Sequence, residues 1–532
     1  MLTNSQSFAL RPPPGRLQLR RTRPRRLVAC RNRIALVSAA EGATIEDCDA
    51  LIVGAGPCGL AAALMLEKRG WKNVTVVERM PTATHYDKER AFMYGIDARG
   101  RKLLQLVGLD EGLPPLGLPT TEFKISYVTP KDGVKDPVSL PIKDDEHTTH
   151  WIPRHKFVGV LSDGVERKQP SSITTLFNTT VTEIRQDDAE GLVVWTQESD
   201  TGEEKCHRPH LLLGCDGLKS QVRDALDGFS EGAFHMQEYP SPSAGLRYKV
   251  LSLPPGFLLD PEGTCARTEQ GYVITGKHKE RRRAARLGVL PMRDPSGTTP
   301  RTANLITSSD HHVWTPGTRP ATAEELYAYL LDNFPQVPWR ETLSVEEAER
   351  FARSEGGRFP TPQHSSRLHY KFSGGVSEGR AQWALLLGDS CHCFPPDLGQ
   401  GVNSALQDVC ALHDTLERCD DDVAKALPEY ESSRMPDIKA LVRLVQVSFP
   451  WQYSQSQLGR FLWALNFFLR TALNKVLPAV FHKHSFLMIQ QSSSSYSSIL
   501  QAANQTTQRL LAVGGLLLAL VGAKLAKAAG IL

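Results

Sequence analysis

Acidic residues are missing from the start of this 532-residue chain. The first 40 residues contain nine arginines but no aspartate or glutamate. Such a segment cannot bury enough apolar surface to fold, and an arginine-rich, acid-free leader is typical of an organellar transit peptide. It also lacks the long apolar core of a secretory signal. Residues 1–45 are therefore predicted to be a disordered transit peptide, with a basic arm for nucleic acid or anionic lipid as the alternative.

Excess positive charge is absent from the rest of the chain. The net charge of +4 becomes −5 when the nine leader arginines are removed. This balance leaves no basic surface that requires a polyanion, and we expect no nucleic-acid partner. The early serines and prolines favour the chloroplast over the mitochondrion as the destination, and both remain open.

A disulfide or zinc framework is also missing. The ten cysteines are spread through the chain, and Cys58 and Cys391 are among those that fall inside motifs described below. This distribution predicts reduced thiols rather than disulfides. Cys391, His392 and Cys393 have no second ligand pair at finger-like spacing, so no metal site is predicted.

The C-terminus holds an apolar run. Residues 510–523 are apolar over 14 consecutive positions, which makes about 21 Å of helix against a hydrocarbon core of about 30 Å. Continuing to the end of the chain gives 23 residues, and Lys524 and Lys527 can extend their ammonium groups to the interface. Residues 509–532 are predicted to be a membrane-anchor helix, with a buried packing helix as the alternative.

Residues 384–412 combine the features of a cofactor site. The pattern predicts a strand, a tight turn at Asp389, a proline-bearing loop, and a helix whose first turn holds Gly399, Gly401 and Asn403. A carboxylate followed by a helix N-terminus suits a ligand that is both polyhydroxylated and anionic, such as a flavin. Asp389 would accept hydrogen bonds from ribityl hydroxyls, and the helix amides would stabilise the anion formed on reduction. An ordinary glycine-rich turn is the alternative.

Residues 49–66 carry a dinucleotide fingerprint. An apolar strand runs into Gly54, Gly56 and Gly59, and an alanine- and leucine-rich helix follows. These glycines serve the tight turn, the approach of a pyrophosphate to the backbone, and the packing of helix on strand. Glu78 ends the next strand, where a carboxylate would bind a ribose. The chain has no second fingerprint of this kind, so a nicotinamide cofactor would bind transiently over the same site.

Residues 211–223, LLLGCDGLKSQVR, again predict a strand, a turn and a helix, with Asp216 and Gly217 in the turn. In their order along the chain, the three segments resemble the signatures of the single-component FAD-dependent aromatic monooxygenases, the para-hydroxybenzoate hydroxylase class. Within that class, the segments YGIDARGRKLLQLVGL, WIPRHKF and SRMPD and the apolar tail are similar to kynurenine 3-monooxygenase. The resemblance covers residues 49 to about 523.

This resemblance implies a cofactor site and a reaction. NADPH or NADH would reduce the flavin, O2 would add at its C4a atom, and the hydroperoxide would pass oxygen to an electron-rich ring or double bond. Pro395 and Pro396 would shape the oxygen pocket as catalytic residues. The implied FAD-binding residues are Gly54, Gly56, Gly59, Glu78, Arg79, Arg90, Arg154, Asp216, Gly217, Asp389, Gly399, Gly401, Val402 and Asn403, with Arg99 nearby.

Positions that hold the amino-acid group in the kynurenine enzymes differ in this chain. The expected arginine falls near Phe123, the two tyrosines near Ile142 and Val480, and the asparagine near Ser448. A carboxylate left without its arginine in a desolvated pocket would lose several kcal/mol. The replacements are mostly apolar, which fits a lipophilic ring system or a polyene, so we predict a small hydrophobic substrate.

The expected fold is α/β, with a three-layer, Rossmann-like FAD-binding domain built from discontinuous segments, a mostly antiparallel substrate sheet and a C-terminal helical region. The predicted function is an NAD(P)H-consuming hydroxylase or epoxidase at an organelle membrane. Alternatives are a kynurenine hydroxylase, a reductase of the geranylgeranyl reductase type, and a non-catalytic flavoprotein that supports a membrane complex. The predicted ranges are 46–115, 206–231 and 376–445 for the FAD domain, 116–205 and 232–375 for the substrate domain, and 446–508 for the helical region.

Overall fold

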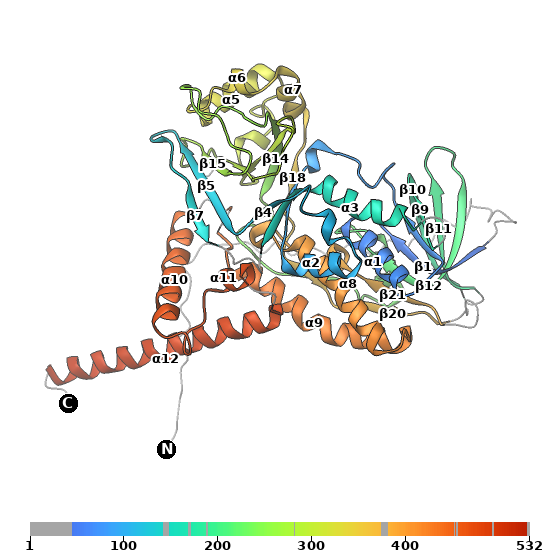
Figure 1. Ribbon diagram of the computed structural model, residues 1–532. Coiled ribbons are helices and arrows are strands. Elements are labelled where there is room, and N and C mark those ends of the chain that lie inside the picture. Colours follow the sequence, from blue (N-terminus) through green and yellow to red (C-terminus); the bar gives the residue numbers. More distant parts are fainter. Residues whose placement is uncertain are drawn as a thin grey trace. The chain divides into compact units, whose positions relative to one another are not determined.

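The computed structural model of the chain is shown in Figure 1. Residues 1–44 of the predicted transit peptide and Ile142 lie outside the described residues, whereas Ile45 begins the first strand. Only the backbone of Arg90 is described. The described residues are 45–141, 148–168, 172–187, 190–280, 282–373, 381–451, 453, 456–491 and 494–528.

The first sheet has eight strands and carries the three glycine motifs. Its apolar central strands are buried, as expected for a parallel sheet covered on both faces. The parallel strands are β9 (Ile173–Leu176), β2 (Val74–Val77), β1 (Ile45–Val53), β12 (Glu204–Gly214) and β21 (Trp383–Leu386). The antiparallel strands are β10 (Thr179–Asp187), β11 (Gly191–Glu198) and β20 (His369–Lys371).

The strand register brings the three motifs to one edge of this sheet. Val53 lies opposite Gly214, and Gly214 lies opposite Leu386. The turns that follow these strands therefore leave the carboxyl ends of three adjacent parallel strands, where ligands of open α/β sheets bind.

Helices pack on the first sheet around a continuous apolar core. Helix α1 contacts both α3 and α8, and α8 contacts α2 and α9. Their apolar residues, such as Leu60 and Leu406, are fully buried. The helices are α1 (Pro57–Lys68), α2 (Ala98–Leu106), α3 (Arg154–Glu166), α4 (Gln221–Phe229), α8 (Gly401–Arg418) and α9 (Val423–Val447).

The second sheet also has eight strands, and all of its pairings are antiparallel except that of β15 with β5. Trp339 and Phe334 belong to the core between this sheet and its helices. The α/β class and the mostly antiparallel second sheet are thus confirmed. The strands are β5 (Glu122–Thr129), β6 (Gly133–Val134), β7 (Val138–Pro141), β14 (Arg247–Leu253), β15 (Gly271–Thr275), β16 (Arg286–Val289), β17 (Arg301–Thr307) and β18 (Gly357–Arg358), and the helices are α5 (Ala323–Asn333), α6 (Trp339–Thr342) and α7 (Val345–Arg353).

Two small sheets and several short helical turns complete this part of the fold. One sheet holds β3 (Met93–Ile96), β8 (Thr149–Pro153) and β4 (Leu118–Thr120), and the other holds β13 (Met236–Glu238), β19 (Gln363–Ser365) and β22 (His392–Cys393). The 3-10 turns include η1 (Lys88–Arg90), η2 (Asp110–Gly112), η4 (His312–Trp314), η5 (Gly388–Ser390) and η6 (Pro396–Leu398).

The predicted substrate-domain range 116–205 is wrong in its second half. Strand β9 pairs with β2, strands β10 and β11 extend the first sheet from β12, and α3 packs on α1. Helix α3 and strand β9 therefore return the chain to the edge of the first sheet. The alternating pattern of β10 and β11 fits an edge of either sheet, so it does not show which sheet they join.

The C-terminal helical region is confirmed, but the predicted boundary at residue 509 is wrong. Helix α12 is continuous over Tyr496–Ala528. Its first turns are buried against α9 through Tyr496 and Ile499, whereas Leu511 and the leucines beyond it are exposed. The tail is preceded by α10 (Gln457–Val476) and α11 (Ser485–Gln490).

Candidate functional site

The second and third motifs are joined by hydrogen bonds at the sheet edge. The Ser390 hydroxyl donates to the Gly214 carbonyl at 2.6 Å, and Arg223 Nη1 donates to the Ser390 carbonyl at 3.0 Å. Asp216 accepts from the Ser220 hydroxyl and the Gln221 amide, each at 2.6 Å. Asp216 thus binds the start of α4, and burial raises the pKa of its carboxyl group.

The first motif has the shape of a phosphate cradle. Gly54 has φ of +102°, and an added Cβ would lie 2.5 Å from the Cys215 carbonyl oxygen. A Cβ on Gly59 would collide with the Gly54 carbonyl, whereas one on Gly56 would meet nothing within 4 Å. Glu78 Oε2 accepts from the Ala55 amide at 2.8 Å, so its carboxylate lies beside the same turn. The open side at Gly56 is where a pyrophosphate would approach the backbone.

Two helix N-termini at this edge have no side-chain cap. Gly56 and Gln400 precede α1 and α8, and neither helix has a side chain that accepts from its first amides. By contrast, Asp97, Ser220 and Asp422 cap α2, α4 and α9. Uncapped first-turn amides can bind an anionic ligand. Cβ atoms added to Gly399 and Gly401 would also meet nothing within 4 Å.

Asp389 lies at the position expected of the ribityl-binding carboxylate. Its side chain is exposed, yet the surrounding protein desolvates the carboxyl group and raises its pKa. Asp389 accepts no hydrogen bond from the described residues, so its oxygens are available to hydroxyls of a ligand.

Arg154, the first residue of α3, lies near Asp389. It begins α3 directly after β8, and its backbone amide donates to Phe92 at 2.9 Å. The Arg154 guanidinium and the Asp389 carboxylate both lie close enough to Tyr94 on β3 for their charges to act on that phenol. Burial raises the pKa of Tyr94, and Arg154 partly opposes this effect. The fold therefore brings Arg154 and Asp389 together, with Tyr94 as a neighbour that the sequence reasoning missed.

Residues 388–403, named the flavin loop here, pack against a buried carboxylate that the sequence did not predict. Asp408 on α8 accepts from the Gly388 amide at 2.9 Å, from His392 Nε2 at 2.8 Å and from Arg434 Nε at 2.7 Å. Burial alone would raise its pKa, but the charges of His392 and Arg434 lower it to about 2. Asp408 thus fixes the turn that presents Asp389. The sequence did offer a signal for this residue: Asp408 lies seven residues, or two helical turns, after Gly401, and therefore on the same face of α8.

Two of these side chains, His392 and Asp408, also belong to a possible metal cluster. Ligand atoms of Cys391, His392 and Asp408 lie within 4.8 Å of one another. Asp408 is already used by three donors, and burial raises the pKa of the Cys391 thiol well above its usual range, which disfavours the thiolate that a metal needs. The hydrogen-bond network explains this arrangement.

Two predicted cofactor contacts have structural roles in their side chains. The side-chain amide of Asn403 is fully buried. Its Nδ2 donates to the Gly95 carbonyl at 2.8 Å, and its Oδ1 accepts from the Asp97 backbone amide at 3.1 Å. Only the backbone of Asn403 is then left to contact a cofactor. Arg99 donates to Ile489 O and Ser494 O and lies over the Tyr496 ring, so it clamps the C-terminal segment.

The remaining predicted residues lie on the same loops. Val402 is in the first turn of α8, and Gly217 follows Asp216 with φ of +78°. Arg79 is exposed after β2. Pro395 is buried, whereas Pro396 is exposed at the start of η6.

Asp397 follows these prolines and points inward. Its Oδ1 accepts from the Ser243 hydroxyl at 2.6 Å, and its buried Oδ2 has no hydrogen-bond partner among the described residues. Burial raises its pKa to about 7, which the Ser243 hydrogen bond partly opposes. Tyr453 lies close enough for the Asp397 charge to raise the pKa of its phenol. Asp397 is therefore a proton-holding group on the flavin loop.

An Asp397→Asn variant is expected to be more stable than the wild type at pH 8, and to show a clearly smaller gain at pH 5. Between about pH 4 and pH 7 the folded state keeps the Asp397 proton, whereas the unfolded state has lost it. The free energy of unfolding therefore falls as the pH rises through this range. Asparagine removes this loss, which amounts to at most about 4 kcal/mol above pH 7. Urea unfolding at the two pH values measures it. Asp200→Asn, at an exposed position, is the matched control, and an equal gain at both pH values would contradict the buried-proton account.

Aromatic side chains form a row beside this loop. Phe92 contacts Tyr248 with ring centroids 5.5 Å apart, Tyr248 contacts Phe359 at 5.5 Å, and Phe359 contacts Tyr453 at 5.4 Å. The row begins next to Arg154 and ends next to Asp397. Phe92, Tyr248 and Tyr453 each keep some accessible surface. This aromatic row is an apolar wall beside the loop.

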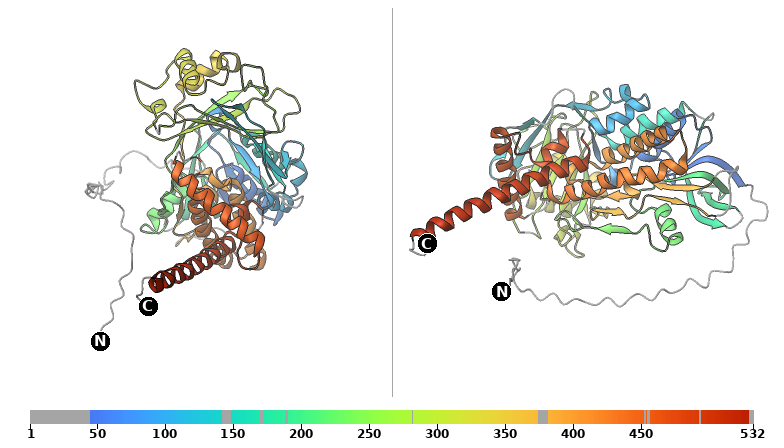
Figure 2. Two further views of the ribbon diagram at one scale, coloured as in Figure 1. Left: turned by 90° about the vertical axis from the view of Figure 1, so that its left-hand side faces the viewer. Right: turned by 90° about the horizontal axis from the view of Figure 1, so that it is seen from below.

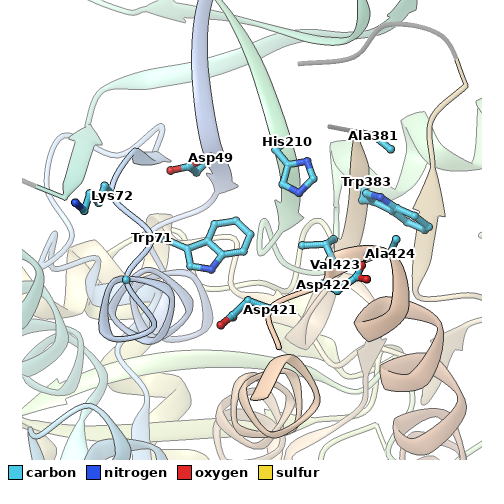
Figure 3. Close-up of a pocket in the computed structure, with 11 residues that line it drawn as sticks. Asp49, Trp71, Lys72, His210, Ala381, Trp383, Asp421, Asp422, Val423 and Ala424 are labelled. Carbon is cyan, nitrogen blue, oxygen red and sulfur yellow. Dashed lines mark hydrogen bonds between the residues drawn. The ribbon is translucent and has the colours of Figure 1, made fainter. Parts of the chain in front are cut away.

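A cavity of about 520 Å³ lies elsewhere (Figure 3). Trp71, His210 and Asp421 are among its lining residues. The lining residues also include Trp383, the first residue of β21, and Trp71 precedes the start of β2, so the cavity lies toward the opposite edge of the sheet from the glycine motifs. It is separate from the cofactor site.

Comparison with known proteins decides the family. A family model described as "FAD binding domain" matches residues 47–313 and 335–445, which is more than half of the chain. Proteins similar to the chain over most of its length are monooxygenases. The chain belongs to the FAD-dependent monooxygenases.

The relatives of this monooxygenase include kynurenine 3-monooxygenases. The Salinispora arenicola enzyme is 24% identical over 477 residues, which cover 89% of this chain and 94% of the relative. The Saccharomyces cerevisiae enzyme is 24% identical over 488 residues, covering 86% and 93%. Among solved structures, the anhydrotetracycline hydroxylase OxyS from Streptomyces rimosus aligns with a TM-score of 0.56 at 19% identity, covering 84% of this chain and 75% of that one.

FAD, the cofactor predicted for this monooxygenase, is confirmed, and O2 is the co-substrate of a monooxygenase. NAD(P)H as the reductant stays a prediction. The residues present fit FAD, since the Gly56 cradle, the uncapped α1 and α8 termini and the free Asp389 carboxylate lie at one sheet edge. The individual FAD contacts remain predictions.

Proposed function

We propose that this protein is an NAD(P)H-consuming hydroxylase or epoxidase of a small hydrophobic aromatic or polyene substrate at an organelle membrane. The observation that carries the substrate class is the aromatic row from Phe92 to Tyr453 beside the flavin loop. Aromatic walls bind apolar rings and conjugated chains through area burial and edge-to-face contacts.

A kynurenine hydroxylase is the second candidate, favoured by the named relatives. The position expected to hold the substrate-binding arginine is Phe123, whose ring lies 5.3 Å from that of Trp151. Ser448, at the expected asparagine, is buried and bonded to Ser485. These contacts are packing rather than carboxylate recognition, and they favour the hydrophobic substrate.

The side chains divide the work of the reaction. Bound FAD supplies the redox chemistry that activates O2 with electrons from NAD(P)H. Asp389 would hold the cofactor through its hydroxyls, and the first amides of α8 would stabilise negative charge on its ring. Pro395 and Pro396 keep water from the oxygen side of the loop. Asp397 holds a proton below about pH 7, and we assign this buried carboxyl group on the same loop as a proton donor or acceptor in the reaction.

Membrane attachment is part of the proposal. One helix, residues Tyr496–Leu525, is long and apolar enough to cross a bilayer, with a mean hydropathy of 1.5 in a window that is 0% buried inside the protein. The arginine-rich leader supports an organelle, with the chloroplast preferred.

Mass spectrometry of lipid and pigment extracts from a strain lacking the protein tests the substrate class. We expect loss of one hydrophobic compound and accumulation of its precursor, lighter by one oxygen atom. An unchanged lipid and pigment profile, together with turnover of kynurenine by the purified protein, would favour the second candidate instead.

A further inference from the structure

Helix α10 has an uncovered apolar face. Its side chains recur every three or four residues along the helix, which places them on one face. Large exposed apolar patches on a folded protein mark a contact with a partner or a membrane. The face consists of Leu458, Phe461, Leu462, Leu465, Phe468 and Leu469, which are between 47% and 68% exposed.

The opposite face of α10 is fixed to the protein. Trp463 Nε1 donates to the Ser448 carbonyl at 2.6 Å, and the Trp463 ring stacks on Phe449 with centroids 4.1 Å apart. Gly459 lies against the ring of Trp451. Because these contacts hold the helix in place, its apolar face is presented outward by the fold itself.

This face adjoins the exposed part of α12. Arg470 on α10 donates to the Ala503 carbonyl at 3.1 Å and to the Thr507 hydroxyl at 2.7 Å. A few residues later, α12 exposes Leu511, Leu516, Leu517, Leu518 and Leu520. Both helices lie on the left side in Figure 1, and the left view of Figure 2 looks onto that side.

The positive charge of the C-terminal region favours a membrane with anionic lipids. Residues 438–532 contain nine lysines and arginines and no aspartate or glutamate. Lys475 and Lys483 are exposed near the C-terminal end of α10. Basic residues close to an anionic bilayer are attracted to its surface. An apolar face bordered by basic side chains is the arrangement of an interfacial helix.

We propose that α10 is a second membrane element, which lies in the headgroup region of an anionic bilayer beside the segment of α12 that enters it. The proposal extends the membrane attachment of the proposed function and does not depend on the identity of the substrate. Tyr453, in the segment just before α10, neighbours Asp397 on the flavin loop. Docking of α10 thus brings the bilayer to the side of the protein from which a hydrophobic substrate would reach the aromatic row.

Depth-dependent fluorescence on the full chain tests this placement. Leu465→Cys, in a Cys265→Ser background, is labelled with an environment-sensitive dye, since Cys265 is the exposed native thiol among the described residues. Vesicles of phosphatidylcholine, with or without phosphatidylglycerol, are added, and quenching by spin-labelled lipid is measured. Leu520→Cys reports on α12, and Asp200→Cys, on the β11–β12 turn, is the control.

We expect a blue shift and at least twofold quenching at positions 465 and 520 with phosphatidylglycerol vesicles, a smaller effect at 465 with phosphatidylcholine alone, and none at 200. Quenching at 520 without quenching at 465 would overturn the α10 proposal and leave the α12 anchor intact. Absence of quenching at positions 465 and 520 would overturn the membrane placement of α10 and of α12. A blue shift at position 465 that appears without vesicles and grows with protein concentration would show that the apolar face of α10 binds a second copy of the chain. That result would contradict the bilayer placement of α10.

Discussion

A Gly56→Val variant is expected to purify without FAD while its apoprotein keeps the wild-type free energy of unfolding. A Cβ at this position meets nothing within 4 Å, and the backbone has φ of −74°, which any residue can adopt. The added side chain instead occupies the space through which a pyrophosphate reaches the backbone amides. Loss of charge-assisted hydrogen bonds of about 1.5–3 kcal/mol weakens binding by roughly 10- to 100-fold or more.

Two other glycine variants make this prediction specific. Gly59→Val is expected to prevent folding, because its Cβ would collide with the Gly54 carbonyl. Gly228→Val, in α4, is expected to keep FAD, because that position is equally open but lies in another element. Fluorescence titration with FAD and urea unfolding of each apoprotein provide the measurements. Retention of FAD by Gly56→Val would contradict the proposed cradle.

An Asp408→Ala variant is expected to lose roughly 3–5 kcal/mol of unfolding free energy, because Arg434 then remains as a buried charge without its partner. Both side chains are almost completely buried, with exposures of 0% and 4%. The Gly388 amide also loses its acceptor, so the turn that presents Asp389 loosens and FAD affinity falls with stability.

A double variant separates charge burial from simple loss of packing. Asp408→Ala combined with Arg434→Met removes both charges, and it is expected to recover part of the stability lost by Asp408→Ala alone. Urea unfolding of the four proteins of this cycle gives the coupling energy. Additive losses, with no recovery in the double variant, would contradict the ion-pair account.

The predictable part of the site depends on local backbone geometry. Gly54, Gly56 and Gly59 are required by a turn and a helix start within a few residues of one another, so the sequence pattern alone identifies them. Asp389 and Gly401 follow the same reasoning. The parallel order of β1, β12 and β21 then follows from three similar strand and helix units.

The other part depends on contacts between distant segments. Arg99 was expected near the flavin, but the C-terminal segment, about 390 residues away in sequence, engages its guanidinium. Asp408 meets Arg434 and Tyr94 meets Arg154 only after the helices and small sheets have packed. Strands β10 and β11 show the same limit, since alternation predicts a strand but not the sheet that it joins.

Anaerobic reduction followed by exposure to air tests the central claim most directly. The purified protein is mixed with NADPH or NADH without oxygen, the flavin absorbance is followed, and air is then admitted with and without a hydrophobic extract of the source membrane. The monooxygenase account predicts bleaching by NAD(P)H and reoxidation by O2, with at least one of the two steps accelerated by the extract. A protein that binds FAD but is never reduced by either nicotinamide cofactor would contradict it.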